Sequence, residues 1–248
     1  MKGVSVFFPV NYISNRLLDI CFLSELFREK LKLPKIYITI LFAFLTISCT
    51  STDPTLKVMS LSAAKNAVQA YYESGEFDRE CAKIIDDAID QMDGIKLTGK
   101  PAVVFDIDET ALSNYEYTKE IGFGYIYKLW NEWQQKGIAP AIKDTKRFYD
   151  HLILRNIHVI FVTGRYAEVG DATKRNLVEQ GYTKFDTLII RSDREREIPA
   201  VEWKAAKRKE LVSKGYNIIA CVGDKWSDLA GGNTGIKIKL PNYLYLLD

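Results

Sequence analysis

The chain has 248 residues, which is long enough for one large α/β domain or for a domain with a small accessory layer. Hydrophobic residues make up 47% of the sequence and charged residues 27%, a balance typical of globular proteins. The formal net charge is only +2, and the positive excess lies in the leader, residues 1–48. The rest of the chain therefore lacks the basic surface of a nucleic-acid-binding protein.

The leader has the pattern of an export signal. An apolar run over residues 36–47 follows several Lys and Arg residues between positions 28 and 35. This run is too short for a transmembrane helix, which needs roughly 20 apolar residues, but it suits the apolar part of a signal peptide. We predict a signal peptide over 28–48, preceded by an extension that a start codon assigned too far upstream would explain.

Cys49 directly follows Ser48 at the end of this run, which resembles a bacterial lipoprotein processing site. The position three residues before the cysteine is Thr46, where such sites usually carry Leu. The resemblance implies a lipidated Cys49, a linker over 49–56, and an exported protein anchored to a membrane on the periplasmic side or at the outer membrane or cell surface. A plain secretory signal and a buried helix are the alternatives for this segment.

Residues 57–99 are predicted to be helical, because apolar and small residues recur there at helical spacing. Ser74-Gly75 separates two helices, and Gly94 ends the second. From residue 100 on, short apolar runs alternate with amphipathic helical patterns, which predicts a parallel sheet covered on both faces. The strand candidates are 102–108, 157–163, 187–190, 218–224 and 236–240, and the helix candidates between them are 142–155, 167–180 and 200–214.

The cysteines and histidines do not indicate a metal site or a nucleophile. None of the four cysteines belongs to a C-x-x-C pair, so the sequence does not support a zinc site. Cys81 and Cys221 lie in apolar patterns and are predicted to be buried small side chains, with a disulfide as the alternative that export would permit. The two histidines, His151 and His158, lie in a helical and a strand pattern and are predicted to be structural.

Polar residues end three of the predicted strands. Because ligands bind beyond the carboxyl ends of the strands in open α/β sheets, we expect these residues to meet at one site. They are Asp106 and Asp108 after the first strand, Thr163 and Gly164 after the second, and Asp224 after the fourth, with Asp228 close behind.

Asp106 and Asp108 stand two residues apart, so their side chains should point to the same side of an extended chain. Two acids so close repel each other, and we expect one to be ionised and the other protonated, which supplies a nucleophile and a general acid. A divalent cation would relieve the repulsion, and Mg²⁺ suits a site of carboxylate and phosphate oxygens. Lys204 opens the helix after the third strand and can neutralise the charge of a transferred group.

The order D-x-D-x-T, T-G-R, a lone Lys and G-D-x-x-x-D resembles that of haloacid-dehalogenase-like (HAD) phosphatases. The longer strings FDIDETALSN, WKAAKR, GDKWSDLAGG and KLPNYLY are similar to the acid phosphatases of subfamily IIIB, which include plant vegetative-storage-type enzymes and bacterial outer-membrane lipoproteins. The likeness runs from about Leu56 to the C-terminus. Ala205 stands where the family often has Ser after the motif Lys, which puts a minor phosphate contact in doubt.

The resemblance implies an α/β fold of the HAD-like Rossmannoid type. This is a three-layer sandwich with a central parallel sheet over 100–248, a small cap inserted after the first strand at about 113–141, and the helical segment before it. It implies an acid phosphatase that hydrolyses small phosphomonoesters, such as 5′-nucleotides, with Mg²⁺ as its cofactor. Both a monomer and a homo-oligomer fit the sequence.

The resemblance also implies roles for the residues at the strand ends. Asp106 would be the nucleophile that forms an aspartyl-phosphate, and Asp108 would be the general acid and base. The phosphate-binding residues would be Thr163, Gly164 and Lys204, and the metal ligands would be Asp106, Asp108 through its backbone carbonyl, Asp224 and Asp228.

Three alternatives stay open at this point. A phosphotransferase of the same fold would pass the phosphoryl group to an alcohol instead of water. A non-catalytic surface or storage lipoprotein would keep the fold without the chemistry, although every catalytic position is filled here. A dehalogenase would need Asp106 but not Asp108. Within the cap, the aromatic residues over 115–133 are expected to form its core, with one or two, such as Trp130 or Trp133, free to stack on a nucleobase.

Overall fold

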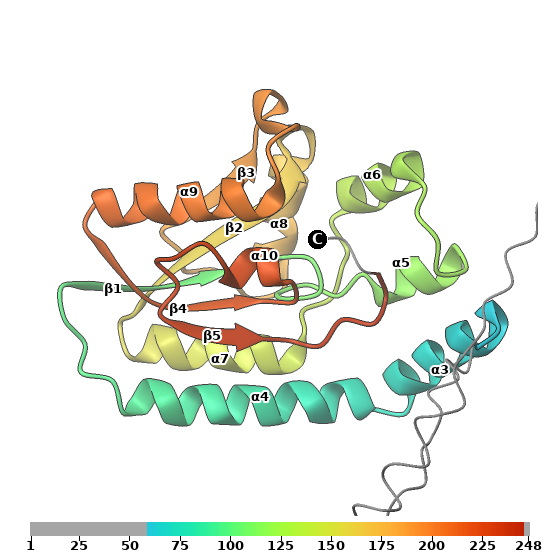
Figure 1. The fold of residues 1–248 in the computed structure, drawn as a ribbon, viewed down its shortest axis with the longest axis horizontal. Coiled ribbons are helices and arrows are strands. Elements are labelled where there is room, and N and C mark those ends of the chain that lie inside the picture. The colour runs from blue at the N-terminus through green and yellow to red at the C-terminus, as the bar shows by residue number, and fades with distance from the viewer. Residues whose placement is uncertain (1–58, 246–248) are drawn as a thin grey trace, which may run out of the picture. The chain divides into compact units, whose positions relative to one another are not determined.

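The computed structural model describes residues 59–245 (Figure 1). The predicted signal peptide, the linker and the proposed lipidation site at Cys49 lie outside these residues. Within the described part of the chain, no helix is both long enough and apolar enough to cross a membrane.

Two helices come first, as predicted. Helix α3 (Leu61–Glu73) begins at Ser60, whose hydroxyl accepts a hydrogen bond from the backbone N–H of Ala63 at 3.2 Å. Helix α4 (Glu76–Asp93) follows after Gly75, which adopts a left-handed conformation with φ +77° that suits glycine. The apolar stripe of α4 is buried against the core, so this helix is an integral layer of the fold.

The sheet has five parallel strands, which confirms the predicted fold class. In chain order they are β1 (Lys100–Phe105), β2 (His158–Tyr166), β3 (Thr187–Arg191), β4 (Tyr216–Gly223) and β5 (Ile236–Lys239). Their spatial order is β3-β2-β1-β4-β5. The chain therefore leaves β1 toward one edge and later returns to pair on its other side, which makes the carboxyl end of β1 the topological switch point.

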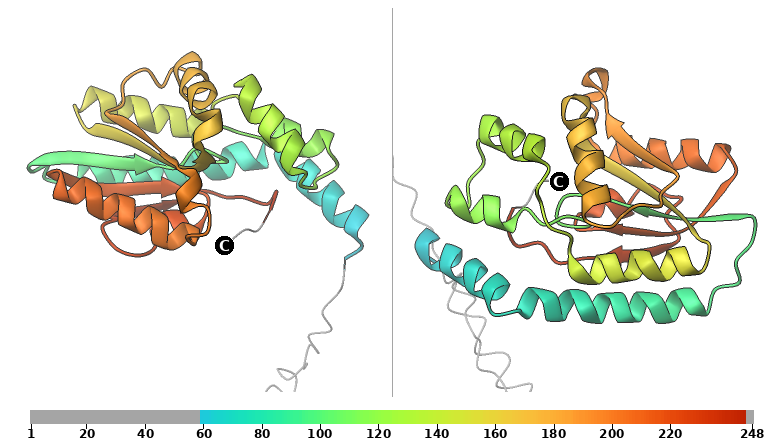
Figure 2. Two further views of the ribbon diagram at one scale, coloured as in Figure 1. Left: turned by 90° about the horizontal axis from the view of Figure 1, so that it is seen from above. Right: turned by 180° about the vertical axis from the view of Figure 1, so that it is seen from behind.

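Helices cover both faces of the sheet (Figure 1; Figure 2, left). Alternate residues of β1 face opposite ways, so Val103 and Phe105 pack in one apolar cluster while Ala102 and Val104 pack in the other. The first cluster includes residues of α4, α7 (Lys143–Leu154) and α8 (Gly170–Glu179). The second includes residues of α9 (Ala200–Ser213) and α10 (Trp226–Leu229). Burial on both faces explains why the strands read as continuous apolar runs.

A small cap is inserted between β1 and β2. It contains helices α5 (Tyr115–Glu120) and α6 (Tyr127–Lys136), which lie beyond the carboxyl ends of the strands (Figure 1). Two short 3₁₀ turns lie in the loops that follow β2 and β3, at Ala167–Val169 (η2) and Asp193–Glu195 (η3). The strand ends and the cap thus enclose the space where the sequence places its polar residues.

The expected structural roles of the cysteines and histidines are confirmed. Cys81 and Cys221 are both buried and unpaired within residues 59–245, and burial raises the pKa of each thiol to about 12. His151 Nε2 lies 3.0 Å from an Asp93 carboxylate oxygen, and His158 pairs with an aspartate in the same way. Neither histidine lines the cavity described below.

Candidate active site

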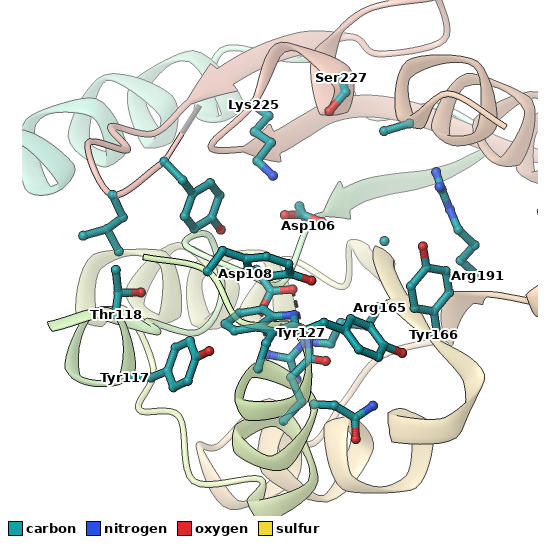
Figure 3. A pocket seen from close by; sticks show the side chains of 18 of the residues that line it. Asp106, Asp108, Tyr117, Thr118, Tyr127, Arg165, Tyr166, Arg191, Lys225 and Ser227 are labelled. Atoms are coloured by element: carbon teal, nitrogen blue, oxygen red, sulfur yellow. Dashed lines mark hydrogen bonds and ion pairs between the residues drawn. The ribbon is translucent and has the colours of Figure 1, made fainter. Parts of the chain in front are cut away.

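A cavity of about 610 Å³ opens between the carboxyl edge of the sheet and the cap (Figure 3). Asp106, Asp108 and Lys204 contribute to the wall formed by the core, and several cap side chains form the opposite wall. The cap aromatics that line it are Tyr117, Phe123, Tyr125, Tyr127 and Trp130. A cavity with an apolar wall and a few convergent polar groups is the usual form of a small-molecule site.

Asp106 immediately follows β1 and lies in the centre of this site. Its backbone N–H donates to the carbonyl of Val222 on β4 at 3.0 Å, which continues the strand pairing up to the functional residue. One carboxylate oxygen lies 2.6 Å from Nζ of Lys204, which also forms an ion pair with Asp228. All three side chains are at least nine-tenths buried, so this is a charge network removed from bulk water.

Burial dominates the electrostatics of this network. Together with the nearby Asp228 carboxylate, it raises the pKa of Asp106 well above its usual value, although the charge of Lys204 opposes the shift. Burial alone would lower the pKa of Lys204, but the two carboxylates outweigh it and the pKa is raised. Lys204 is therefore held as a cation beside Asp106.

Asp224 immediately follows β4, the neighbour of β1 on the side away from β2, and is held by two polar side chains. The Thr110 hydroxyl lies 3.3 Å from one carboxylate oxygen and also accepts the Asp224 backbone N–H at 3.0 Å. The side-chain amide of Asn242 donates to the other oxygen at 2.6 Å. Burial, followed by the repulsion of Asp228, raises the pKa of Asp224 to about 7.

The carboxylates of Asp106, Asp224 and Asp228 together fit a hard divalent cation. Each offers one oxygen, and these oxygens lie within 4.8 Å of one another in a buried position. Carboxylate oxygens are the ligands that Mg²⁺ prefers, and a cation among them would offset their repulsion and favour their ionised forms. Arg208 supports the loop that carries Asp228, because its guanidinium donates to the Asp228 carbonyl at 2.9 Å and to the Gly232 carbonyl at 3.0 Å.

Asp108 has a different environment from Asp106. Arg165 donates to its carboxylate from Nη2 at 2.7 Å and from Nε at 3.1 Å (Figure 3). The Asn114 amide also donates to it, at 2.9 Å. Burial disfavours the charge of Asp108, but Arg165 and these hydrogen bonds outweigh it and lower its pKa. The two pKa values thus shift in opposite directions, because Arg165 stabilises the ionised form of Asp108 while burial and Asp228 disfavour the ionised form of Asp106.

A chain of hydrogen bonds fixes Asp108 from the cap side. Asn114 accepts a hydrogen bond from the indole Nε1 of Trp133 on α6 at 2.8 Å while it donates to Asp108. The neighbouring Glu109 accepts the Asn114 backbone N–H at 2.8 Å and the hydroxyl of Tyr245. Burial, then the charge of Asp108, raises the pKa of Glu109 to about 7. The position of the cap is thereby coupled to the orientation of the second aspartate.

Thr163 and Gly164 occupy different places at the end of β2. Gly164 lines the cavity, as expected of a residue that lets backbone approach a ligand closely. Thr163 is fully buried behind it, and its hydroxyl accepts the Arg165 backbone N–H at 3.1 Å. This contact lies within β2, where the pairing with β3 is irregular, and it helps to present the Arg165 guanidinium to Asp108.

The structure also separates the cap aromatics into two groups. Trp133 lies outside the cavity lining and acts through Asn114, with its ring 5.7 Å from that of Tyr117. Trp130 lines the cavity. Of the two tryptophans considered for stacking, only Trp130 is therefore placed to contact a ligand.

Sequence analysis missed four residues that hold the carboxylates in place. Asn114 closes the string FDIDETALSN, Arg165 closes T-G-R, and Asn242 and Tyr245 lie in KLPNYLY. All four were inside strings that carried the family resemblance, so a signal existed. The partner of Asn114 lies only six residues away, whereas Arg165, Asn242 and Tyr245 reach carboxylates that are distant in sequence, so the sequence could not assign their partners.

Comparison with known proteins agrees with this fold. Residues 47–247 match the family model of the HAD superfamily, subfamily IIIB (Acid phosphatase). The structure is similar to the crystal structure of a class C acid phosphatase from Bacillus anthracis with tungstate bound. The TM-score is 0.60 and the sequence identity 23%, and the match covers 75% of this chain and 87% of that one.

Plant proteins are similar in sequence. The stem 28 kDa glycoprotein of Glycine max is 40% identical over 154 residues, which cover 60% of this chain and 61% of the relative. Acid phosphatase 1 of Solanum lycopersicum is 28% identical, with 73% of each chain covered, and vegetative storage protein 1 of Arabidopsis thaliana is 33% identical, with 57% and 54% covered. The chain thus spans about three-fifths of the length of the soybean relative.

The carboxylate cluster leads to a prediction for metal binding. Replacing Asp224 by Asn removes a charged ligand, so we expect Mg²⁺ binding measured by isothermal titration calorimetry to weaken strongly. Asn242→Ala keeps all three carboxylates but loses the amide that orients Asp224. For this variant we expect a smaller loss, about 10- to 100-fold, as is usual when a group that orients a metal ligand is removed.

Asp171→Asn is the matched control, because Asp171 is an exposed acid on α8 outside the cavity. We expect it to bind Mg²⁺ like the unaltered protein. Unchanged affinity in both the Asp224 and the Asn242 variants would show that the cation binds elsewhere.

Proposed function

The chain belongs to the HAD superfamily, subfamily IIIB, and from this membership and the geometry of its cavity we propose that it is a Mg²⁺-dependent acid phosphatase. The observation that carries the proposal is the position of Asp106. It is a buried carboxylate at the switch point of the sheet, it faces a substrate-sized cavity, and it is flanked by the Lys204 cation and by two further carboxylates suited to a metal.

In the proposed first step, a carboxylate oxygen of Asp106 attacks phosphorus. A bond between Asp106 and phosphorus forms while the bond to the leaving oxygen breaks, and that oxygen takes a proton from Asp108. In the second step, Asp108 takes a proton from water, the water oxygen bonds to phosphorus, and the bond to Asp106 breaks to release phosphate. Lys204 stabilises the negative charge of the transferred group in both steps.

A Mg²⁺ ion held by Asp106, Asp224, Asp228 and the backbone carbonyl of Asp108 would supply further positive charge at the phosphoryl oxygens. The environment of Asp108 bears on its two roles. Arg165 favours its ionised form, which is the form that accepts a proton from water in the second step. The donor role in the first step requires the protonated form, which an acidic medium favours.

The aspartate pair gives the decisive test of this mechanism. Asp106→Asn removes the nucleophile, so we expect no phosphoenzyme and loss of activity on all substrates alike. Asp108→Asn keeps the nucleophile but loses the proton donor and base. Formation of its phosphoenzyme should fall about 10²- to 10⁴-fold more with a nucleoside 5′-phosphate than with nitrophenyl phosphate, since nitrophenolate leaves without a proton.

Because Asp108 is also the proposed base, Asp108→Asn should release one burst of nitrophenolate and then stall with phosphate bound to Asp106. Rapid-quench trapping with hydroxylamine would detect this acyl phosphate. No burst, together with equal losses on aryl and alkyl substrates, would disprove the acid and base role. Phosphorylated alcohol instead of phosphate as the main product would indicate a phosphotransferase, and no turnover of any phosphomonoester would indicate a non-catalytic storage protein.

The aromatic wall of the cavity favours substrates that carry an aromatic group, such as 5′-nucleotides. If Trp130 stacks on the base, Trp130→Ala should raise KM for a nucleoside monophosphate about tenfold or more, as expected for the loss of base stacking. The KM for a sugar phosphate should change little. Trp130→Phe keeps an aromatic face and should recover most of the loss, whereas equal effects on both substrates would make the ring a packing residue only.

We also propose that the protein is exported and anchored through lipidated Cys49, which the sequence pattern of its leader supports. A lipoprotein with several acyl chains binds a membrane stably. Cys49→Ala should therefore move the protein from the membrane fraction to the soluble fraction, while Ser51→Ala should leave it in place. Unchanged partitioning of the cysteine variant would contradict the anchor.

A further inference from the structure

Arg191 is an unpaired cation in the wall of the cavity. Arg191 is only 7% exposed, yet it lines the cavity together with Tyr166 and Ala200. Its Nε and Nη2 are buried and have no hydrogen-bond partner among residues 59–245. Burying a charged group without a partner is costly, so the position of this side chain needs an explanation.

The fold holds Arg191 firmly in this place. It ends β3, where it pairs with Tyr166 of β2, and its guanidinium lies 5.0 Å from the ring centre of Trp203 on α9. Contact with an aromatic face stabilises a guanidinium but leaves its N–H groups free. Nε and Nη2 have almost no exposed surface of their own, but the side chain lines the cavity, so a ligand that enters it can supply acceptors to the guanidinium once the side chain turns toward it.

Of the other cations in the cavity wall, Lys204 and Arg165 are already engaged by the reacting carboxylates, and Lys225 points toward these carboxylates with its Nζ 4.7 Å from the ring centre of Tyr245 (Figure 3). Lys204 forms ion pairs with Asp106 and Asp228, and Arg165 forms one with Asp108. Within the described region, no ion pair of Arg191 with a carboxylate is formed. Arg191 thus carries a positive charge in the cavity that the proposed chemistry does not use.

The position of Arg191 separates it from the transferred phosphoryl group. That group must lie at Asp106, which follows β1, whereas Arg191 ends β3, two strands away in the order β3-β2-β1. Two strand spacings amount to about 10 Å. Figure 3 shows Arg191 and Tyr166 together on one side of Asp106, opposite Tyr117 and Thr118. The Arg191 side chain is therefore placed to contact a second group of a substrate whose phosphoryl group lies at Asp106.

We propose that Arg191 is a subsite for a second anionic group, a carboxylate or a phosphate, that the substrate carries several bonds away from the scissile phosphate. A planar guanidinium with free donors matches the paired oxygens of either group. The inference rests on the proposed phosphatase function and deepens it, because it makes doubly anionic phosphomonoesters the preferred substrate class. Arg191 is then a specificity-determining residue.

Binding of phosphonates, which are not hydrolysed, tests this subsite apart from turnover. The probes are pentylphosphonate, 5-phosphonopentanoate and pentane-1,5-bisphosphonate, titrated calorimetrically into the full chain with Mg²⁺. We expect at least one of the two doubly anionic probes to bind about tenfold or more tightly than pentylphosphonate, as expected for a charge-assisted hydrogen bond. The probe that gains more identifies the second group as carboxylate or phosphate. Arg191→Gln should abolish the gain and leave pentylphosphonate binding within about twofold.

Lys207→Gln is the matched control. Lys207 lies 5.7 Å from the same Trp203 ring but pairs with Glu195 at 2.8 Å and does not line the cavity. Lys207→Gln removes one positive charge, as Arg191→Gln does, but leaves the subsite intact. The preference for doubly anionic probes over pentylphosphonate should therefore persist in this variant. Thermal unfolding of Arg191→Gln should occur no lower than in the unaltered protein, because the substitution removes a buried unpaired charge.

Other results would overturn the proposal. Equal weakening of all three probes in Arg191→Gln would place Arg191 on the transferred phosphoryl group. Equal binding of all three probes by the unaltered protein would show that no second anion is recognised. Unchanged selectivity with a lower unfolding temperature would make Arg191 a structural partner of Trp203. Phosphonate selectivity without hydrolysis of any phosphomonoester would contradict the phosphatase proposal while leaving the subsite in place.

Discussion

Mutual repulsion of buried carboxylates is the constraint on which this structure depends. Asp106, Asp224 and Asp228 are buried together at the carboxyl edge of one parallel sheet, with the half-buried Asp108 beside them, and burial disfavours each negative charge. Lys204 lies between Asp106 and Asp228, and a guanidinium covers Asp108. Each of these cations comes from a different strand or helix, so the network forms only when the whole sheet and its helices are assembled.

The charged residues around the D-x-D pair give its two aspartates different surroundings. Asp106 is set among carboxylates that can share a cation, whereas Asp108 is turned toward Arg165 and Asn114. Asn114 is in turn held by Trp133 of the cap. Trp133 and Asn114 thus connect the cap to the environment of Asp108. This coupling links enclosure of the substrate to the proton transfers that we propose for Asp108.

Membership of the family does not by itself decide what the protein acts on. Its relatives carry the names of acid phosphatases and of vegetative storage proteins. The features that would decide lie in the cavity wall, where an aromatic surface on the cap faces a core surface that includes the unpaired guanidinium of Arg191. An aromatic surface and a separate cation recognise different parts of a ligand, so together they would restrict the substrate more than either does alone.

The sequence by itself determined the fold class and the location of the site. Strands buried on both faces must be continuous apolar runs, and Asp106, Thr163 and Asp224 directly follow such runs, so their meeting at one edge follows from parallel pairing. Glycine directly follows the helical patterns over 167–180 and 200–214, and in the structure Gly181 and Gly215 both adopt the left-handed conformation that favours glycine at a helix end.

Only the tertiary structure decided which partner each charged group received. Arg165 reaches Asp108 across 57 positions of sequence, and Thr110 reaches Asp224 across 114. Side-chain direction, cap position and burial determine such contacts, and no local pattern records them. For this reason the sequence predicted that the two aspartates would differ in pKa without saying in which direction, and it gave no sign that Arg191 would be buried without a partner among the described residues.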